Sequence, residues 1–197
     1  MNDIRLNKQI EFILEIDKLK SVYRQSLISD GSREENDAEH SWHLAVMAIV
    51  LHEYANDNNI DLLKVLKMVL VHDIVEIDAG DTFIYDKSGN ETKAQRETLA
   101  AERIFGLLPP EQYHEFKELW EEFEARETPE AKFAAVLDRL EPLLLNLITG
   151  GHTWKKFSVT SDRVLQKNRH TRQGSIILWE YIERIIEECI KKGYLDK

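Results

Sequence analysis

The helical spacing of apolar residues constrains the fold of this 197-residue chain more than any other feature. The chain has only 8 glycines and 4 prolines, so few positions interrupt this spacing. The periodic segments predict helices over about 6–19, 38–57, 62–77, 92–107, 111–125, 129–149, 161–170 and 174–192. We therefore expect an all-α fold, a compact single-domain helical bundle of about six to eight helices over residues 1–197.

The ends of these helices carry recognisable signals. Asn36 or Asp37 is expected to cap the second helix, Asp61 the third, and Thr128 the sixth, with Pro129 at its first helical position. The segment "DAGDTFIYDKSGNE" is expected to be a long polar loop, and "GGHTWKKFS" a turn. In the first helix, the apolar stripe that contains Ile10, Ile13 and Leu14 is expected to face the core.

The composition limits the partners and the compartment. Lysine and arginine number 26 against 36 aspartates and glutamates, and this net charge of −10 argues against a nucleic acid polymer as partner. A small anion could still be held by local cations. The single cysteine, Cys189, allows no internal disulfide. The apolar run "LAVMAIVL" is far shorter than the roughly 20 residues of a membrane span, and the first residues do not resemble a signal peptide. We expect a cytoplasmic protein without a membrane partner.

The most informative chemistry follows the third predicted helix, in "VHDIVEIDAGD". His72 and Asp73 are neighbours on a helix, and they diverge by about 100°, so both can reach one ion only at the edge between them. Two other apolar helices supply further ligand types, His40 and Asp138. A carboxylate in an apolar helix is costly to bury unless it is paired or metal-bound. Alternatively, His40 is an ordinary core histidine and Asp138 an ordinary charge beside Arg139.

Three segments of the chain resemble the HD-domain metal-dependent phosphohydrolases, in particular the small single-domain branch that contains the 5′-deoxynucleotidases. They are "SREENDAEHSWHLA", "VHDIVEIDAGD" and "KFAAVLDRLEPLL", and the resemblance extends over about 12–179. It implies a helical bundle of the HD-domain type and one divalent ion (Mn, Co, Fe, Ni, Zn or Mg). The ligands that it implies are His40, His72, Asp73 and Asp138.

The same resemblance assigns roles to other residues. Glu76 and Asp81 are implied to be catalytic, in water activation and substrate contact, and Arg24 is implied to lie near the phosphate. Glu76 follows His72 by four residues and is expected one turn further on the same helix face, where it could take a proton from water. Lys20 and Arg33 are further candidates for binding the substrate's phosphate.

Several histidines and one tryptophan leave alternatives open. His43 lies near the face of His40 and is either a group behind the ligands or a helix-packing residue. Trp42 is expected to be a packing or interface residue rather than a platform for a base. His52, His114, His152 and His170 are expected to be surface or structural residues. Binuclear cyclic-nucleotide phosphodiesterases of the wider superfamily carry extra histidines between the dyad and the last aspartate, where this chain has only His114. We therefore expect one ion and no cyclic-nucleotide hydrolysis.

These expectations favour an enzyme that removes the 5′-phosphate from (deoxy)nucleoside monophosphates by means of a metal-activated water. The alternatives are a phosphohydrolase of the same fold that acts on a nucleoside triphosphate, an alarmone or a non-nucleotide phosphate, and a metal-stabilised helical module without catalysis. In a further alternative, a helical interaction protein, the four ligand candidates never meet. A homodimer is expected, through the apolar helix "GSIILWEYIERIIEECI", although packing within the monomer also explains that helix.

Overall fold

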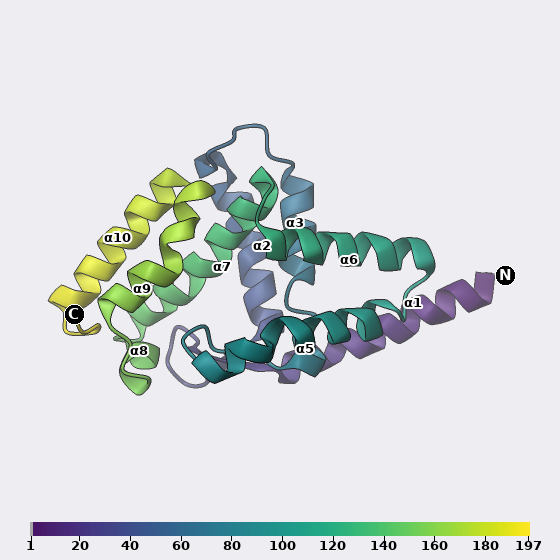
Figure 1. The fold of residues 1–197 in the computed structure, drawn as a ribbon, viewed down its shortest axis with the longest axis horizontal. Coiled ribbons are helices and arrows are strands. Elements are labelled where there is room, and N and C mark those ends of the chain that lie inside the picture. Colours follow the sequence, from purple (N-terminus) through teal and green to yellow (C-terminus); the bar gives the residue numbers. More distant parts are fainter. Residues whose placement is uncertain (1) are drawn as a thin grey trace.

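The computed structural model describes residues 2–197, and α-helices dominate it (Figure 1). The α-helices are α1 (Asn2–Ile16), α2 (Asp37–Leu51), α3 (Leu62–Val71), α4 (Glu76–Ala79), α5 (Lys87–Phe105), α6 (Pro110–Ala125), α7 (Pro129–Ile148), α8 (His152–Lys156), α9 (Ser161–Asn168) and α10 (Ile176–Lys191). Short 3-10 helices are η1 (Asp17–Ser21), η2 (His52–Tyr54) and η3 (Arg169–Gln173). Eight α-helices within residues 2–197 have eight or more residues, so the predicted all-α bundle is confirmed.

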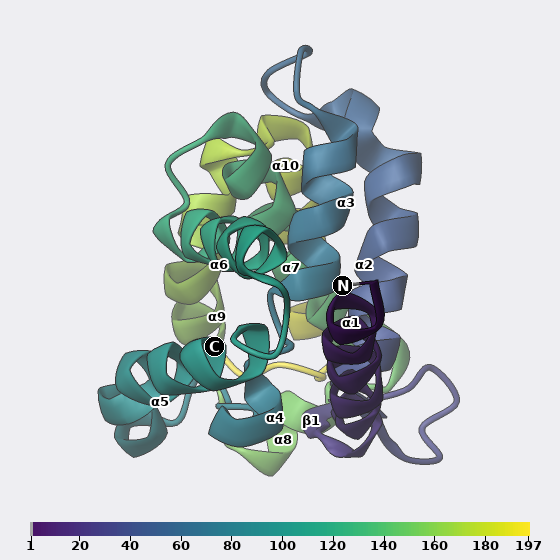
Figure 2. The same ribbon diagram turned by 90° about the vertical axis from the view of Figure 1, so that its right-hand side faces the viewer.

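Helix α7 is the central element, and its sequence explains both its start and its burial. Thr128 accepts a hydrogen bond from the amide of Ala131 at 3.2 Å, and Pro129 occupies the first helical position. Phe133, Leu137 and Leu140 are buried in the core, where each contributes about 1.5–3 kcal/mol through the apolar surface that it removes from water. Helix α7 packs against α2, α3, α6 and α10. Figure 2 shows α2 and α3 side by side, next to α7.

A two-stranded sheet is the element that periodicity did not predict. Strands β1 (Tyr23–Leu27) and β2 (Glu34–Asn36) pair antiparallel, with Tyr23 opposite Asn36 and Leu27 opposite Glu34. Asn36 ends this hairpin and also caps α2, because its side chain accepts a hydrogen bond from the amide of Glu39 at 3.0 Å. The cap is thus Asn36 rather than Asp37, whose side chain is buried at the site described below.

The third predicted helix is shorter than expected, so the predicted position of Glu76 relative to His72 is wrong. Helix α3 ends at Val71, and residues 72–75 form tight turns before α4 begins at Glu76. The amide of Glu76 donates to the carbonyl of Asp73 at 2.9 Å, a three-residue spacing. Glu76 therefore does not lie one α-helical turn beyond His72 on a continuous helix.

Other differences concern loops and faces. The predicted polar loop ends early, since α5 already begins at Lys87, and the predicted turn after α7 contains α8. Ile10, Ile13 and Leu14 of α1 are exposed, whereas Phe12 is the buried apolar residue of this stretch. Helix α10 packs its apolar face against α7, which agrees with the monomer alternative for that helix. Within residues 2–197, no helix has the length and apolarity that a membrane crossing requires.

Candidate metal centre

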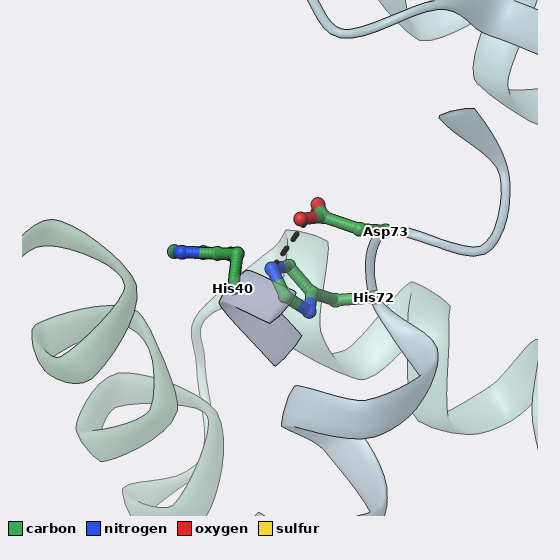
Figure 3. A group of neighbouring side chains, drawn as sticks. All are labelled: His40, His72 and Asp73. Carbon is green, nitrogen blue, oxygen red and sulfur yellow. Dashed lines mark ion pairs between the residues drawn. The ribbon is translucent and has the colours of Figure 1, made fainter. Parts of the chain in front are cut away.

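The four predicted ligands lie on three segments that the fold brings together. His40 is in the first half of α2, His72 and Asp73 directly follow α3, and Asp138 is near the middle of α7. His40 Nε2 lies 3.3 Å from Asp138 Oδ1, and His72 Nε2 lies 3.1 Å from Asp73 Oδ1 and 3.9 Å from Asp138 Oδ1. His40, His72 and Asp73 each offer an atom within 4.8 Å of the others. Figure 3 shows His72 and Asp73 adjacent on one segment and His40 on a separate helix.

Both imidazole rings are held so that Nε2 faces this group. His72 Nδ1 lies 3.0 Å from the carbonyl oxygen of Val69, and His40 Nδ1 lies 3.2 Å from Glu141 Oε2. When each Nδ1 donates its proton to that oxygen, each Nε2 is left with a free lone pair. Among the described residues, His72 Nε2 is buried and has no hydrogen-bond partner. A buried imidazole nitrogen without a partner, beside two carboxylates, fits a divalent cation. Metal-binding histidines commonly donate their other ring N–H to an oxygen that orients the ring, as both histidines can do here.

The charges of the group agree with this fit. Burial lowers the pKa of His72, so its imidazole is neutral, as a metal ligand must be. Burial opposes a charged Asp138, but Arg139 and His40 outweigh it and hold the pKa of Asp138 well below its usual range. Burial and Arg24 disfavour a charged His40, yet hydrogen bonds to Asp138 and Glu141 raise the pKa of His40 to about 10. Without an ion, a proton on His40 therefore balances these carboxylates.

Arg24 lies inside the site, but carboxylates already surround it. Its Nη1 donates to Asp73 Oδ2 at 3.0 Å and to Asp37 Oδ1 at 3.2 Å, and its Nε lies 3.7 Å from Glu35 Oε2. Arg24 thus fixes the Asp73 side chain from the β1 strand. The other two predicted cations lie elsewhere: Lys20 is exposed and pairs with Asp17, and Arg33 is exposed and pairs with Glu39 at 2.6 Å. Neither is among the described residues that line the cavity.

Glu76 and Asp81 reach the same cavity by different routes. Glu76, the first residue of α4, is buried, and its Oε2 has no hydrogen-bond partner among residues 2–197. Burial and the neighbouring carboxylates of Asp73, Asp37 and Asp81 raise the pKa of Glu76 well above its ordinary value. Asp81 lines the cavity from the loop after Gly80, whose positive φ of 73° lets the chain turn there.

The cavity beside the candidate metal ligands has a volume of about 320 Å³, suitable for a small molecule. His72, Asp73, Glu76, Asp81 and Asp138 form one part of its wall. Phe83, Tyr85 and Trp154 supply aromatic surface, and Arg126, Arg139 and Lys167 supply positive charge. His170, expected to be a surface or structural residue, also lines this cavity.

The sequence motifs did not indicate the carboxylates behind His40. Glu141 is buried and contacts His40 Nδ1 with one oxygen and His43 Nδ1 with the other, each at 3.2 Å. His43 therefore lies behind the ligand candidates, where it helps to hold Glu141. Spacing could have indicated Glu141, because it follows Asp138 by three residues on α7. Glu35, whose Oε2 lies 3.7 Å from His40 Nδ1, gives no such signal because it belongs to β2.

Two further groups of side chains also offer atoms within 4.8 Å of one another, namely Glu35, His43 and Glu141, and Asp37, Asp73 and Glu76. Both adjoin the group of His40, His72 and Asp73. The number of bound ions therefore stays a prediction.

Fold and site together define a helical domain that gathers histidines and aspartates from three segments into a candidate divalent-metal centre. A family model described as "HD domain" matches residues 16–179, close to the range over which the motifs resemble that family. The chain belongs to the HD-domain family.

Two curated relatives are similar over about two thirds of the chain. The human 5′-deoxynucleotidase HDDC2 is 34% identical over 136 residues, which cover 68% of this chain and 65% of the human protein. The mouse protein of the same name is 33% identical over 68% of this chain and 66% of its own length. The matched segment thus spans slightly less than two thirds of these curated relatives.

Solved structures are similar over nearly the whole fold. A crystal structure of a predicted metal-dependent phosphohydrolase from Magnetospirillum magnetotacticum is 50% identical, with a TM-score of 0.96 over 100% of this chain and 98% of that one. The PH0347 protein from Pyrococcus horikoshii is 26% identical, with a TM-score of 0.62 over 93% of this chain and 99% of that protein.

Proposed function

We propose that the protein is a metal-dependent phosphomonoester hydrolase that removes the 5′-phosphate from (deoxy)nucleoside monophosphates. The observation that carries the proposal is the convergence of His40, His72, Asp73 and Asp138 at one edge of a cavity, with His72 Nε2 left unpartnered. The names of the 5′-deoxynucleotidase relatives support the substrate class, and the cavity volume is compatible with a nucleotide.

Three of the four proposed ligands have a defined support in the protein. His40 is oriented by Glu141, His72 by the Val69 carbonyl, and Asp73 by Arg24. When bound, a divalent ion here supplies positive charge that lowers the pKa of a nearby water and neutralises phosphoryl oxygens. Two neutral imidazoles and two carboxylates suit Mn, Co, Fe, Ni or Zn, with Mg as a further candidate.

Glu76 is the proposed acceptor of the proton from the attacking water. Its carboxyl group is buried beside Asp73, and a high pKa makes its carboxylate a stronger base. As the water oxygen bonds to phosphorus, the bond from phosphorus to the 5′-oxygen breaks, and Glu76 passes the proton that it took from water to the 5′-oxygen of the leaving nucleoside. Asp81 is proposed to accept a hydrogen bond from a sugar hydroxyl, because it lines the same cavity from a loop.

A phosphate-release panel on metal-stripped protein tests this proposal. The panel crosses Mn, Co, Mg and Zn with deoxy- and ribonucleoside monophosphates, triphosphates and cyclic nucleotides. We expect release from 5′-monophosphates with at least one metal and none from cyclic nucleotides. Glu76→Ala should retain metal by elemental analysis yet lose about 10²–10⁴-fold in kcat, as removal of a proton acceptor does. Asp73→Ala should lose the metal.

The panel also separates the alternatives. Release from triphosphates but not from monophosphates would replace the proposed substrate class. No release with any metal and substrate would contradict the proposal that the protein is an enzyme.

Four other expectations stay predictions from the sequence. They are the extent of the HD domain over 1–197, the homodimer, the cytoplasmic location and the absence of a nucleic acid polymer as partner.

A further inference from the structure

The cavity wall contains a group of cations that the proposed reaction does not yet use. Arg126 comes from the C-terminal end of α6, Arg139 from α7 and Lys167 from α9, and all three line the cavity. They come from three different elements, and 41 positions separate the first from the last along the chain. Arg139 directly follows Asp138, and its Nε lies 3.4 Å from Asp138 Oδ2, so the group adjoins the proposed metal ligands.

Arg126 is held in an unfavourable backbone conformation that places it at this wall. It has a φ of 53° and ψ of 39°, the left-handed region that usually favours glycine at the end of a helix. Its Nη1 donates to His170 Nε2 at 3.2 Å, and its Nε is buried without a partner among residues 2–197. A strained arginine with an unused donor at a cavity wall points to a ligand.

Carboxylates of the protein neutralise the other cations of the cavity, but they leave the charges of this group largely unbalanced. Arg24 contacts three carboxylates within 3.7 Å, and Lys93 pairs with Glu97 at 3.3 Å. Within residues 2–197, neither Arg126 nor Lys167 has a carboxylate oxygen within 4.0 Å, and Arg139 contacts only Asp138, which it shares with His40. The partner of Arg126 is an imidazole kept neutral, because burial, Arg126 and Arg139 lower the pKa of His170 to about 4.

An anionic ligand is the simplest compensation for such a group. Like charges that share one cavity wall repel each other, and the repulsion is strong where water is partly excluded. The planar guanidinium groups of Arg126 and Arg139 present paired donors that match the oxygens of a phosphate. Carboxylates already surround Arg24, the cation predicted for the phosphate, so Arg24 has less unbalanced charge to offer.

We propose that Arg126, Arg139 and Lys167 form the subsite that binds the phosphoryl group of the substrate beside the metal ligands. The ligand class is a phosphate monoester dianion, and inorganic phosphate, the product, should bind there as well. This inference rests on the proposed function for the identity of the substrate. The binding of phosphate itself can be measured without any turnover.

The test compares the binding of inorganic phosphate to wild-type protein and variants by calorimetry, together with KM for a nucleoside monophosphate. Arg126→Gly is the sharpest variant, because glycine relieves the left-handed backbone while it removes the guanidinium. We expect its melting temperature to stay the same or rise, while the Kd for phosphate and KM each rise at least about tenfold, as the loss of a charged hydrogen bond implies. Lys167→Gln should weaken phosphate binding in the same direction.

Arg184→Gln is the matched control, since Arg184 lies on α10, outside the residues that line this cavity, and contacts the ring of Tyr181. It should leave both constants within about twofold of wild type. If wild-type protein binds phosphate, the variants lose this binding and no monophosphate is hydrolysed, the subsite stands and the proposed function fails. If monophosphates are hydrolysed and Arg126→Gly and Lys167→Gln keep wild-type values of Kd and KM, the subsite is overturned.

Discussion

At the scale of single residues, the site contains side chains that the protein holds in place at one atom and leaves facing carboxylates or without a partner at another. His40 and His72 each have an oxygen at Nδ1, and the Nε2 atoms of both face carboxylates. Glu76 and Arg126 each keep one buried atom without a partner among the described residues. Unsatisfied buried groups cost stability, so their concentration at one cavity indicates a binding site rather than a structural core.

His170 gives a prediction about the dependence of stability on pH. Burial, with the charges of Arg126 and Arg139, lowers its pKa from 6.5 to about 4, and Asp138 opposes this shift. Below pH 6.5 the unfolded chain therefore binds a proton that the folded protein excludes. The free energy of unfolding should fall as the pH decreases from about 6.5 towards 4, and the contribution of His170 is fully present only above 6.5.

The measurement is chemical denaturation of wild type and His170→Asn at pH 7 and pH 4.5, with a chelator present so that loss of metal does not contribute. Because His170 is partly exposed and its charge is screened, we expect wild type to lose only about 1–2 kcal/mol more than the variant. Equal losses in the two proteins would show that the imidazole of His170 is not kept neutral by its surroundings.

At the scale of elements, helical periodicity predicted the long helices well and their junctions poorly. The cap at Thr128 and the long course of α7 follow from local sequence signals, and both were predicted. The end of α3 at Val71 was not predicted, because "VHDIVEI" continues the apolar pattern. The turn there depends on the tertiary contacts of His72 and Asp73, which periodicity does not show. The β1–β2 hairpin is short, so strand alternation gave it no signal.

The identity of the candidate ligands could be predicted from the sequence motifs, but the positions of the surrounding side chains could not. Periodicity placed His40, His72 and Asp138 on apolar helices, and this was enough to nominate them. It could not show that Lys20 and Arg33 lie outside the cavity or that Arg126 lies at its wall. Arg126 reaches the wall because it adopts a left-handed conformation at the end of α6. Arginine rarely adopts this conformation, so the sequence gives no indication of it.

The junction after α7 gives a prediction at this scale. Gly150 and Gly151 both have positive φ, 68° and 74°, but only Gly151 packs closely against the C-terminal segment. A Cβ at Gly151 would lie 1.9 Å from the Tyr194 carbonyl oxygen, whereas at Gly150 the nearest atom, in the Tyr194 ring, would be 3.9 Å away. Gly151 thus sets the position of α8, whose Thr153 and Trp154 line the cavity.

Alanine at either glycine should cost about 1–2 kcal/mol of unfolding free energy through the left-handed backbone alone. Gly151→Ala should cost about 1–3 kcal/mol more, because backbone must shift to admit the methyl group. Urea denaturation of both variants measures the difference, and Gly150→Ala is the matched control. Similar losses at the two positions would show that the contact with Tyr194 is loose and does not position α8.

At the scale of the whole molecule, two apolar clusters meet near the candidate metal centre. One is built around α2, α3, α7 and α10, and the other around α5 with parts of α1, α4 and α6. Val69 belongs to the first cluster and Val71 and Ile74 to the second, so the chain passes from one cluster to the other directly before His72 and Asp73. The site therefore depends on the packing of both clusters.

The homodimer stays a prediction, and we propose the exposed face of α2 rather than α10 as its contact surface, because α10 uses most of its apolar residues within the monomer. Helix α10 buries Leu178, Ile182 and Ile186 within the monomer. Trp42 on α2 is instead 65% exposed, near the exposed Val46 and Ile49 of the same helix. Trp42 is also absent from the described cavity lining. A large aromatic side chain so exposed beside aliphatic ones is typical of a contact between proteins, where tryptophan often contributes strongly to binding.

We expect light scattering to give twice the mass of one chain for wild-type protein, and Trp42→Glu to raise the dimer dissociation constant at least about tenfold by placing a charge in the contact. Leu99→Glu is the matched control, because Leu99 on α5 is equally exposed, at 65%, and lies on a different helix. It should remain dimeric at concentrations where Trp42→Glu is monomeric. A monomeric wild type would contradict the homodimer itself, whereas dissociation by Leu99→Glu alone would place the contact on α5. Since Trp42 precedes His43 and follows His40 by two residues, a dimer through this face would also restrain the start of α2 that carries a proposed metal ligand.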